Sequence, residues 1–206
     1  MPRALGQIDL AKNEAILEAA YDVLAERGLS APMSAIARRA GVSKQTIYNH
    51  YGAKTDLIRA LANRRSKTLT APLQSRNDGG PEETLATYAK VLLAMISAPR
   101  GYCLMRLTIQ SAGELPELAR EVYEAGPRAT HRRLAAFLKA EDEAGRLDVD
   151  DPLEAAEMFS SMTIGHKQIR LLMGLPIELD EEGLSRLSRD VAHRFVRAYA
   201  PNGKGR

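Results

Sequence analysis

The sequence predicts an all-α protein, with a small N-terminal helix-turn-helix domain followed by a larger helical bundle. Three observations support this class. Apolar residues recur at spacings of three and four through most of the 206 residues. Clusters of glycine and proline divide the periodic segments into lengths typical of helices. No segment shows the strict apolar-polar alternation of a half-buried strand. We expect about nine helices from this pattern.

Glycine and proline residues divide the first third of the chain into three predicted helices. Gly28 follows the first apolar stripe and suits the position after a helix C-terminus. Pro32 suits the first turn of the next helix, where its missing N–H has no partner. Gly41 separates the second helix from the third, and Ser43 can cap the third. We therefore expect helices at residues 9–27, 33–40 and 44–50.

The rest of the chain continues the helical periodicity after a fourth, longer helix at 54–75. The turn cluster at 77–81, Asn-Asp-Gly-Gly-Pro, marks a boundary. We predict three parts: a helix-turn-helix domain at 1–53, a connecting helix at 54–76, and a bundle at 77–206. A bend is expected near Gly126-Pro127, because proline removes a backbone hydrogen bond. The expected bundle helices are 82–97, 102–112, 116–143, 152–173 and 180–199.

Composition narrows the possible classes of protein. Apolar residues make up 45% and charged residues 27%, which argues against disorder. The longest apolar runs are too short for a membrane span, and the N-terminus lacks the apolar core of a signal peptide. The single cysteine, Cys103, excludes an internal disulfide and any zinc site built from several thiolates. We expect a reducing, cytoplasmic location and no membrane partner.

The charge is distributed unevenly along the chain. Residues 1–67 hold eleven Lys and Arg against six Asp and Glu, whereas the remainder holds eighteen against twenty. Basic charge concentrated in one small segment is typical of proteins that bind polyanions. A solvated helical surface is the alternative explanation for the same imbalance.

The segment 36–48 has the pattern of a helix-turn-helix. Ala37 is small where two helices would cross closely, and Gly41 permits the positive φ of the turn. Ile47 is placed to brace the second helix, and Ser43 caps it, so that its free N–H groups can face a phosphate. Such a helix lies in the major groove of DNA. A short-helix corner inside an ordinary bundle is the alternative.

Residues 12–60 resemble the DNA-binding domain of the TetR family of bacterial transcriptional regulators. The matching pieces are Ile16-Leu17-Glu18-Ala19-Ala20, Ala25-Glu26-Arg27-Gly28, Ile36-Ala37, Gly41-Val42-Ser43, Thr46 through Tyr51, and Lys54 with Leu57. Residues 82–199 are similar to the regulatory domain of the AefR-like subfamily. That similarity is carried by Gly113-Glu114-Leu115-Pro116-Glu117-Leu118, Ala125-Gly126-Pro127, Gly145-Arg146-Leu147 and Asp151-Pro152.

The resemblance implies a homodimer that binds a palindromic operator in double-stranded DNA, and it implies repression. Gln45 would contact adenine and Lys54 a phosphate, while Arg3 and Lys12 would add further contacts. The full set of implied DNA contacts is Ser34, Ser43, Lys44, Gln45, Thr46, Tyr48, Asn49, His50 and Lys54.

Four positions depart from the family pattern: Ala31, Pro32, Ala53 and Tyr51, the last being a mild change from the commoner Phe. Ala31 and Pro32 stand where a Ser or Thr usually starts the second helix, so that Ser34 is the remaining candidate for that hydroxyl. Ala53 stands where many members have Ser, which predicts a weaker cap on the fourth helix.

The resemblance also implies a dimer interface on the last two long helices, formed here by Ala155, Phe159, Leu184, Leu187, Val191 and Phe195. The middle helices would enclose a small apolar or amphipathic effector that releases the protein from DNA. A methionine-rich interior suits varied apolar ligands, although ordinary core packing explains it equally well. The candidate ligand residues are Tyr88, Met95, Leu107, Tyr123, Phe137, Met162 and His166.

No pattern in the sequence indicates an enzyme. There is no nucleophile–base motif, no paired-carboxylate motif and no glycine-rich phosphate loop. His131 and His166 lack the spacing of a zinc motif, and we expect neither a metal nor a cofactor. Two rivals remain: an enzyme that uses the helical cavity, and a dimeric adaptor that has lost DNA binding.

Overall fold

The computed structural model describes residues 5–74 and 79–201, with side chains from residue 11 onward, and confirms the all-α class. Across these described ranges the regular structure is helical throughout, and no strand occurs. The chain forms two compact units: residues 1–65 with 103–126, and residues 66–102 with 127–206. We call them unit 1 and unit 2.

Two kinds of feature are absent from the described residues. None of the helices there combines the length and apolar character that crossing a membrane requires. No cluster of three or more His, Cys, Asp or Glu side chains in those residues is arranged to hold a metal ion.

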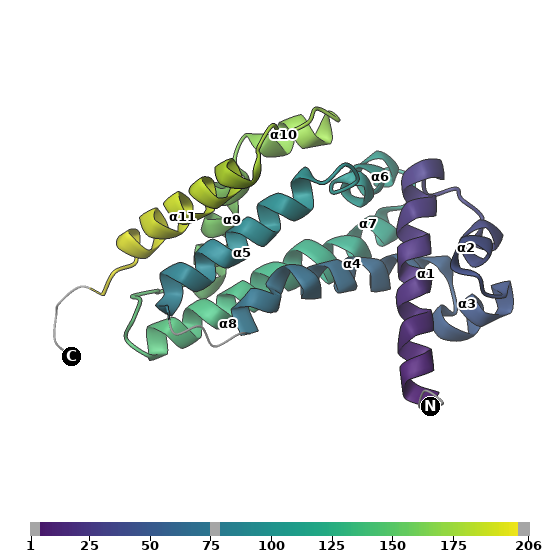
Figure 1. Cartoon of the computed structure of the whole chain (residues 1–206), viewed down its shortest axis with the longest axis horizontal. Helices are drawn as coiled ribbons and strands as arrows, with labels where there is room; N and C mark the ends of the chain where they lie inside the picture. Colours follow the sequence, from purple (N-terminus) through teal and green to yellow (C-terminus); the bar gives the residue numbers. More distant parts are fainter. Residues whose placement is uncertain (1–4, 75–78, 202–206) are drawn as a thin grey trace. The chain divides into compact units, whose positions relative to one another are not determined.

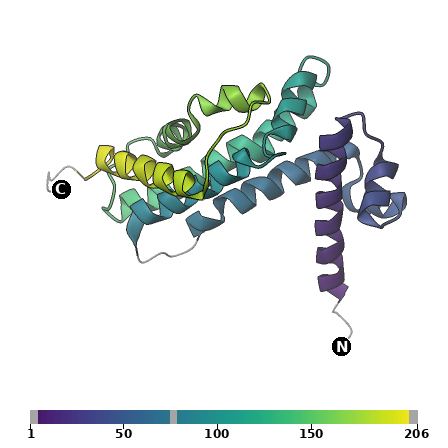
Figure 2. The same cartoon turned by 45° about the horizontal axis from the view of Figure 1, so that its top comes forward.

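Unit 1 contains α1 (Leu5–Arg27), α2 (Met33–Ala40), α3 (Lys44–Tyr51), the first twelve residues of α4 (Lys54–Thr70), α6 (Cys103–Ser111) and α7 (Pro116–Tyr123). In both views α2 and α3 lie on the same side of α1 (Figure 1, Figure 2). The apolar stripes of these helices meet in one core, whose fully buried members include Ile16, Ala20, Ile36, Ile47 and Leu57. Burial of these stripes is the main source of the unit's stability.

Ion pairs on the surface of unit 1 connect its helices to α1. Arg39 of α2 donates to Glu26 at 2.9 Å, and Arg64 of α4 donates to Glu18 at 2.6 Å. Exposed pairs of this kind contribute roughly 0–1 kcal/mol each, so they orient the helices more than they stabilise them.

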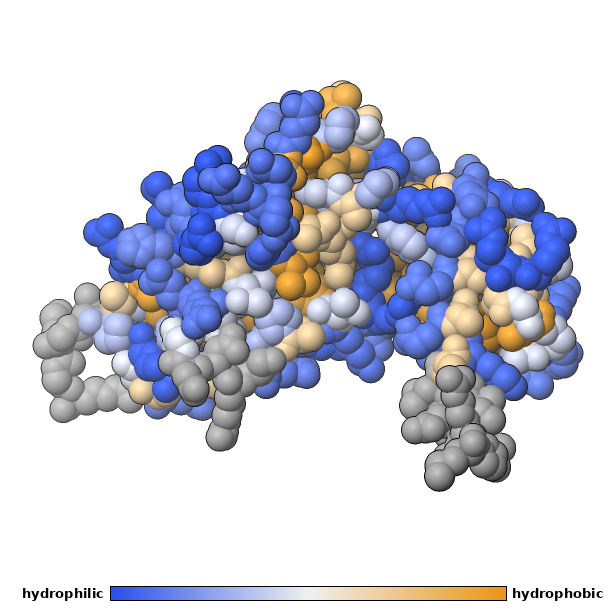
Figure 3. All heavy atoms as spheres, in the orientation of Figure 1, coloured by the Kyte–Doolittle hydropathy of each residue, from blue (hydrophilic) through white to orange (hydrophobic). Residues whose placement is uncertain are grey.

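Unit 2 contains the end of α4, the 3₁₀ turn Ala71–Gln74, α5 (Gly80–Ser97), α8 (Ala129–Glu143), α9 (Pro152–Ile164), α10 (Lys167–Leu172) and α11 (Glu181–Ala198). Helix α5 packs along α11, and α8 packs along α9. The centre of the core is aromatic: the Phe159 ring centroid lies 5.9 Å from that of Tyr88 and 5.0 Å from that of Phe195. Apolar side chains also reach the surface over α10 (Figure 3).

Two of the helices expected from the sequence are interrupted. The segment 116–143 contains a π-helical segment, Glu124–Arg128, at the predicted bend, because Pro127 cannot donate the regular helical hydrogen bond. The segment 152–173 breaks after α9, where Gly165 adopts φ 51° and ψ −142°, outside the helical region. The helix expected at 54–75 ends at Thr70, and the 3₁₀ turn that follows contains Pro72.

The compact units divide the chain differently from the three predicted parts. Helices α6 and α7 join the N-terminal helices, because Leu104, Leu118 and Val122 are buried in the same apolar core as Ile16. The predicted turn cluster at 77–81 lies partly outside the described residues. The shared core therefore places α6 and α7 in the same unit as the N-terminal helices. The order of the helices along the sequence did not predict this.

Candidate nucleic-acid interface

The turn between α2 and α3 requires a glycine. Gly41 adopts φ 66° and ψ 29°, in the left-handed region. The Val42 amide donates to the Ala37 carbonyl at 3.0 Å, which closes the end of α2. A Cβ atom on Gly41 would meet nothing within 4 Å, so the requirement comes from the backbone conformation rather than from crowding.

Ser43 begins the candidate recognition helix, α3. Its Oγ accepts a hydrogen bond from the Thr46 amide at 3.0 Å and lies 2.8 Å from the Thr46 Oγ1. The first turn of a helix has backbone N–H groups without a partner inside the helix. The Ser43 hydroxyl accepts a hydrogen bond from one of them, and the others point out from the helix N-terminus. The predicted cap is therefore present, and the positive end of the helix dipole faces outward with it.

One face of α3 is buried and the opposite face is free of negative charge. Ile47 is fully buried and packs in the core that contains Ile36 and Ala37. The helix sequence Lys-Gln-Thr-Ile-Tyr-Asn-His-Tyr carries no carboxylate. The side chains that share the exposed face at spacings of three and four are Lys44, Gln45, Tyr48 and Asn49.

These exposed side chains are organised in pairs one helical turn apart. The Lys44 ammonium lies 5.5 Å from the centroid of the Tyr48 ring, a cation–π distance. The Gln45 Nε2 donates to the Asn49 Oδ1 at 2.8 Å. Each pair restricts the rotamers of long polar side chains before any ligand is bound, which lowers the entropy lost on binding.

Lys54 is directed inward rather than outward. Its ammonium donates to the Leu29 carbonyl and, at 2.6 Å, to the Ala31 carbonyl, at the turn between α1 and α2. The side chain is half-buried, and burial lowers the pKa of its amino group. The expectation that this ammonium holds a DNA phosphate stays a prediction, since two of its three N–H donors are used by carbonyls of unit 1.

The start of α4 is capped by a residue that sequence reasoning overlooked. The Ala53 amide donates to the Asp56 Oδ2 at 3.1 Å, which is one half of a capping box. The signal was present in the sequence as an acidic residue three positions after the expected cap. At the start of α2, Pro32 supplies no side-chain cap, and Ser34 is exposed in the first turn, where its hydroxyl is accessible.

The end of α3 carries one exposed and one structural aromatic side chain. His50 is exposed, and its ring centroid lies 6.2 Å from that of Tyr51. The Tyr51 hydroxyl donates to the Asn13 Oδ1 of α1, and burial raises the pKa of Tyr51 to about 12. Tyr51 therefore holds α3 against α1. Lys12 is exposed on α1, whereas Arg3 lies outside the described residues.

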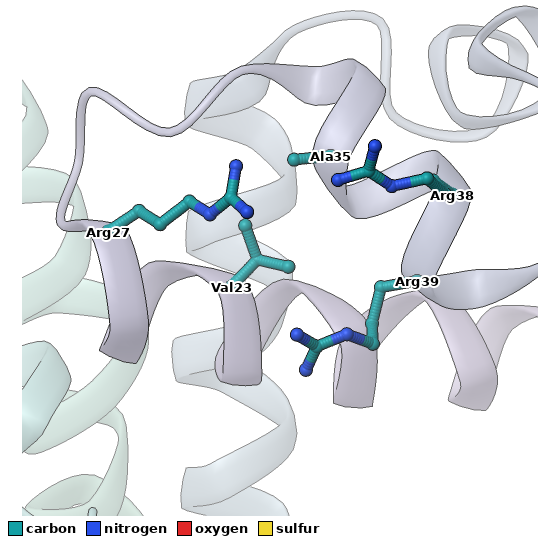
Figure 4. A pocket seen from close by; sticks show the side chains of 5 residues that line it. All are labelled: Val23, Arg27, Ala35, Arg38 and Arg39. Atoms are coloured by element: carbon teal, nitrogen blue, oxygen red, sulfur yellow. The ribbon is translucent and has the colours of Figure 1, made fainter.

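A cationic hollow lies on another part of unit 1, between α1 and α2. Val23 and Ala35 form part of its lining, and the side chains of Arg27, Arg38 and Arg39 project around its volume of about 310 Å³ (Figure 4). Arg39 is the member paired with Glu26, as described above. Arg27 and Arg38 add positive charge to unit 1 near the helix-turn-helix.

The predicted effector residues do not form one cluster. Tyr88 is fully buried in unit 2, and Met95 and Phe137 pack at the edge of the same core. Met162 and His166 are exposed at the surface of unit 2. Leu107 and Tyr123 belong to unit 1, where Leu107 packs against the core and Tyr123 is exposed.

Polar atoms in the interior of unit 2 give a different set of candidate ligand contacts. Among the described residues, neither the Tyr88 hydroxyl nor the Ser160 hydroxyl has a partner at good hydrogen-bonding geometry, although the two lie close enough to interact. The His131 Nδ1 is also buried without a partner there. The signal for Ser160 was a polar residue on the apolar stripe of the segment 152–173.

The residues predicted for the dimer interface lie mostly inside a single chain. Leu187 is half-buried, whereas the other five fill the core of unit 2: Ala155, Phe159, Leu184, Val191 and Phe195. These five side chains have little surface left for a second copy, and their part in a dimer interface stays a prediction. The exposed apolar side chains of the same region are Leu153, Met158, Met162, Ile169, Met173 and Leu175.

Comparisons with known proteins agree with this geometry. The profile described as bacterial regulatory proteins of the tetR family matches residues 16–61. The profile described as the C-terminal domain of AefR-like transcriptional repressors matches residues 83–201. The HTH-type transcriptional regulator YvkB of Bacillus subtilis is 25% identical over 163 residues, covering 79% of this chain and 84% of that protein.

Two solved structures share the fold along nearly the whole chain. The flavonoid-responsive regulator FrrA is 34% identical, with a TM-score of 0.70, and the match covers 93% of this chain and 98% of FrrA. A TetR-family regulator from Mesorhizobium loti is 23% identical, with a TM-score of 0.74, covering 92% and 96% of the two chains. Since the profile matches span the capped helix α3 and more than half of the chain, this protein belongs to the TetR family of DNA-binding transcriptional regulators, with an AefR-like C-terminal domain.

Proposed function

We propose that this chain is a homodimeric repressor that reads a palindromic operator with α3 of each copy and is released by a small apolar or amphipathic effector. One observation carries the proposal: α3 is capped by Ser43, braced by the buried Ile47, and exposes a face without carboxylates. The AefR-like repressor profile supports repression. Such a protein acts on the bacterial chromosome, and therefore in the cytoplasm.

A second copy of the chain accounts for the apolar surface on α9 and α10. Met162 is 43% exposed, Ile169 53% and Met173 72%. Apolar side chains this exposed on two consecutive helices are typical of an interface rather than of a free surface. A two-fold dimer would present two copies of α3 to half-sites about one turn of DNA, ~34–36 Å, or a multiple of it apart.

The interior of unit 2 supports an effector that combines apolar surface with hydroxyl groups. The Tyr88 ring packs beside that of Phe159, and the Tyr88 and Ser160 hydroxyls lie close enough to interact but not at good hydrogen-bonding geometry. A phenolic molecule would supply both the apolar contact and the missing hydrogen bonds, whose absence is costly in a buried site. That FrrA is described as flavonoid-responsive favours the same class of compound.

DNA binding is tested by fluorescence anisotropy on a duplex from the region upstream of the chain's own gene. Log K should fall steeply and linearly with log salt. Lys44→Ala should weaken binding and lower the salt slope by about 1 per copy. Lys139→Ala, which removes an exposed lysine from α8 in unit 2, is the matched control and should leave both quantities unchanged. Absence of salt-dependent binding would favour the adaptor that has lost DNA binding.

The dimer and the effector need separate measurements. Met162→Glu should raise the dimer dissociation constant in analytical ultracentrifugation, whereas Ala136→Glu, at an exposed position of α8, should not. Flavonoids titrated into the protein–operator complex should release the DNA, and Ser160→Ala should shift the half-effective concentration. A panel of phenols that leaves operator affinity unchanged would contradict the effector part alone.

A further inference from the structure

We infer that Asn49 is a positioning residue that fixes the amide of Gln45 for the reading of one adenine in each operator half-site. The inference rests on the proposed DNA-binding function and adds to it the residue that positions the adenine-reading amide. Its starting observation is the 2.8 Å hydrogen bond from the Gln45 Nε2 to the Asn49 Oδ1. Both side chains are exposed on the carboxylate-free face of α3.

The chemistry of a side-chain amide explains why this bond favours adenine. The NH₂ group of glutamine carries two hydrogens, and its carbonyl oxygen has two lone pairs. One hydrogen is committed to Asn49, which leaves one N–H and the carbonyl available as a fork. In the major groove adenine offers the N7 acceptor and the N6 donor side by side, which that fork matches. Guanine offers two acceptors there, so the Gln45 carbonyl would face another oxygen.

Three of the neighbouring polar side chains are engaged with partners other than Gln45. The hydroxyls of Ser43 and Thr46 are paired with each other at 2.8 Å, and Lys44 lies over the ring of Tyr48. Gln45 is the second residue of α3, in the N-terminal part of the helix that contacts base edges in helix-turn-helix proteins. Asn49 lies one helical turn further toward the C-terminus of α3, where its Oδ1 accepts the hydrogen bond from the Gln45 amide.

The alternative is that the pair only stabilises the helix surface. Amide pairs at this spacing stabilise an isolated helix slightly. A helix-stabilising role would change the affinity for all DNA sequences equally. A positioning role changes the ratio of affinities between the preferred base pair and the other three, so the two roles predict different readouts.

The experiment begins with duplexes selected from a random pool by the full-length wild-type protein. Each base pair of the selected half-site is then replaced by the other three, and the ratio of Kd values is measured by anisotropy at constant salt. One A·T pair should show discrimination of about 5- to 150-fold, the range of a bidentate contact. Gln45→Ala should abolish discrimination at that pair and leave the other positions unchanged.

Two substitutions of the positioning residue then separate its role from a general one. Asn49→Ala should lower discrimination at the same A·T pair by about 3- to 10-fold, because the Gln45 amide must then be ordered on binding. Asn49→Asp keeps the acceptor, so it should retain the discrimination while weakening binding uniformly through charge repulsion. The double variant Gln45→Ala/Asn49→Ala should match Gln45→Ala at that pair, which is the non-additivity of two coupled residues.

Several results would overturn the inference. Discrimination at the Gln45-dependent pair that survives Asn49→Ala would show that the hydrogen bond has no role in reading. A new preference at a second base pair in Asn49→Asp would show that Asn49 contacts DNA itself. A selected palindrome without a Gln45-dependent adenine would also refute the inference while leaving the proposed function intact. If the wild-type protein selected no duplex, both would fail.

Discussion

Lys54→Met separates a structural role of this lysine from a contact with DNA. In the structure, the Lys54 ammonium donates to the carbonyls of Leu29 and Ala31, and so ties the start of α4 to the turn between α1 and α2. Methionine keeps the apolar stem and removes the donor. The substitution should therefore lower the free energy of unfolding while leaving the electrostatic part of DNA binding unchanged.

The magnitude follows from the environment of the ammonium. Hydrogen bonds to charged groups contribute about 1.5–3 kcal/mol, and the lower end applies because Lys54 is only half-buried and water can replace it at the carbonyls. We expect a loss of about 1.5 kcal/mol, measured as a shift of the urea midpoint at constant m-value. The slope of log K against log salt should equal that of the wild type.

Lys44→Met is the matched control, since Lys44 is exposed on α3 and lies over the ring of Tyr48. It should show the opposite pattern, with stability within about 0.5 kcal/mol of wild type and a salt slope lower by about 1 per copy. A Lys54→Met variant with a lower salt slope and an unchanged urea midpoint would show that this ammonium contacts DNA and does not stabilise unit 1.

Three further predictions concern the turn, the core and the pH dependence. Gly41→Ala should cost about 1 kcal/mol because of its positive φ, whereas Gly41→Asn should cost less, since asparagine tolerates the left-handed region; equal unfolding curves for both variants would argue against a backbone origin. Phe159→Ala should destabilise unit 2 by about 3–5 kcal/mol, because the ring is fully buried against Phe195; a loss below about 1 kcal/mol would mean that the core collapses around the gap. Burial lowers the pKa of His131 from 6.5, so the unfolded chain takes up a proton before the folded chain as pH falls. The free energy of unfolding should therefore decrease below about pH 6.5, and His131→Gln should reduce that decrease between pH 7.5 and 5.5; identical pH profiles would contradict this origin.

Much of the DNA-binding element could be predicted before the structure was known. Gly41 and Ser43 fix the turn and the start of α3 through backbone conformation and one side-chain hydrogen bond, and both effects act within a few residues. The bounds expected for the second helix agree with α2, and the third helix extends one residue further than expected, to Tyr51. Signals of this kind are readable because residues that are close in sequence are necessarily close in space.

Lys54 and Asp56 show which side-chain contacts the sequence pattern could not predict. The position of Lys54 at the start of α4 was correct, but the direction of its ammonium depends on carbonyls more than twenty residues earlier. Asp56 was visible as an acidic residue in the first turn, yet its role emerged only from its bond to the Ala53 amide. A side chain of this length has several rotamers, and tertiary contacts select among them.

The amino-acid pattern is enough to predict that the chain is helical, where most helices begin and end, and which family it resembles, because periodicity, caps and turns are local properties. Three features became visible in the folded chain alone: the stripe containing Phe159 and Phe195 faces inward, α6 and α7 share a core with α1, and Tyr88 lies close to Ser160. An amphipathic helix has an apolar face whatever it packs against. Its partner is chosen by shape and burial across the whole fold, which the pattern of one helix does not encode.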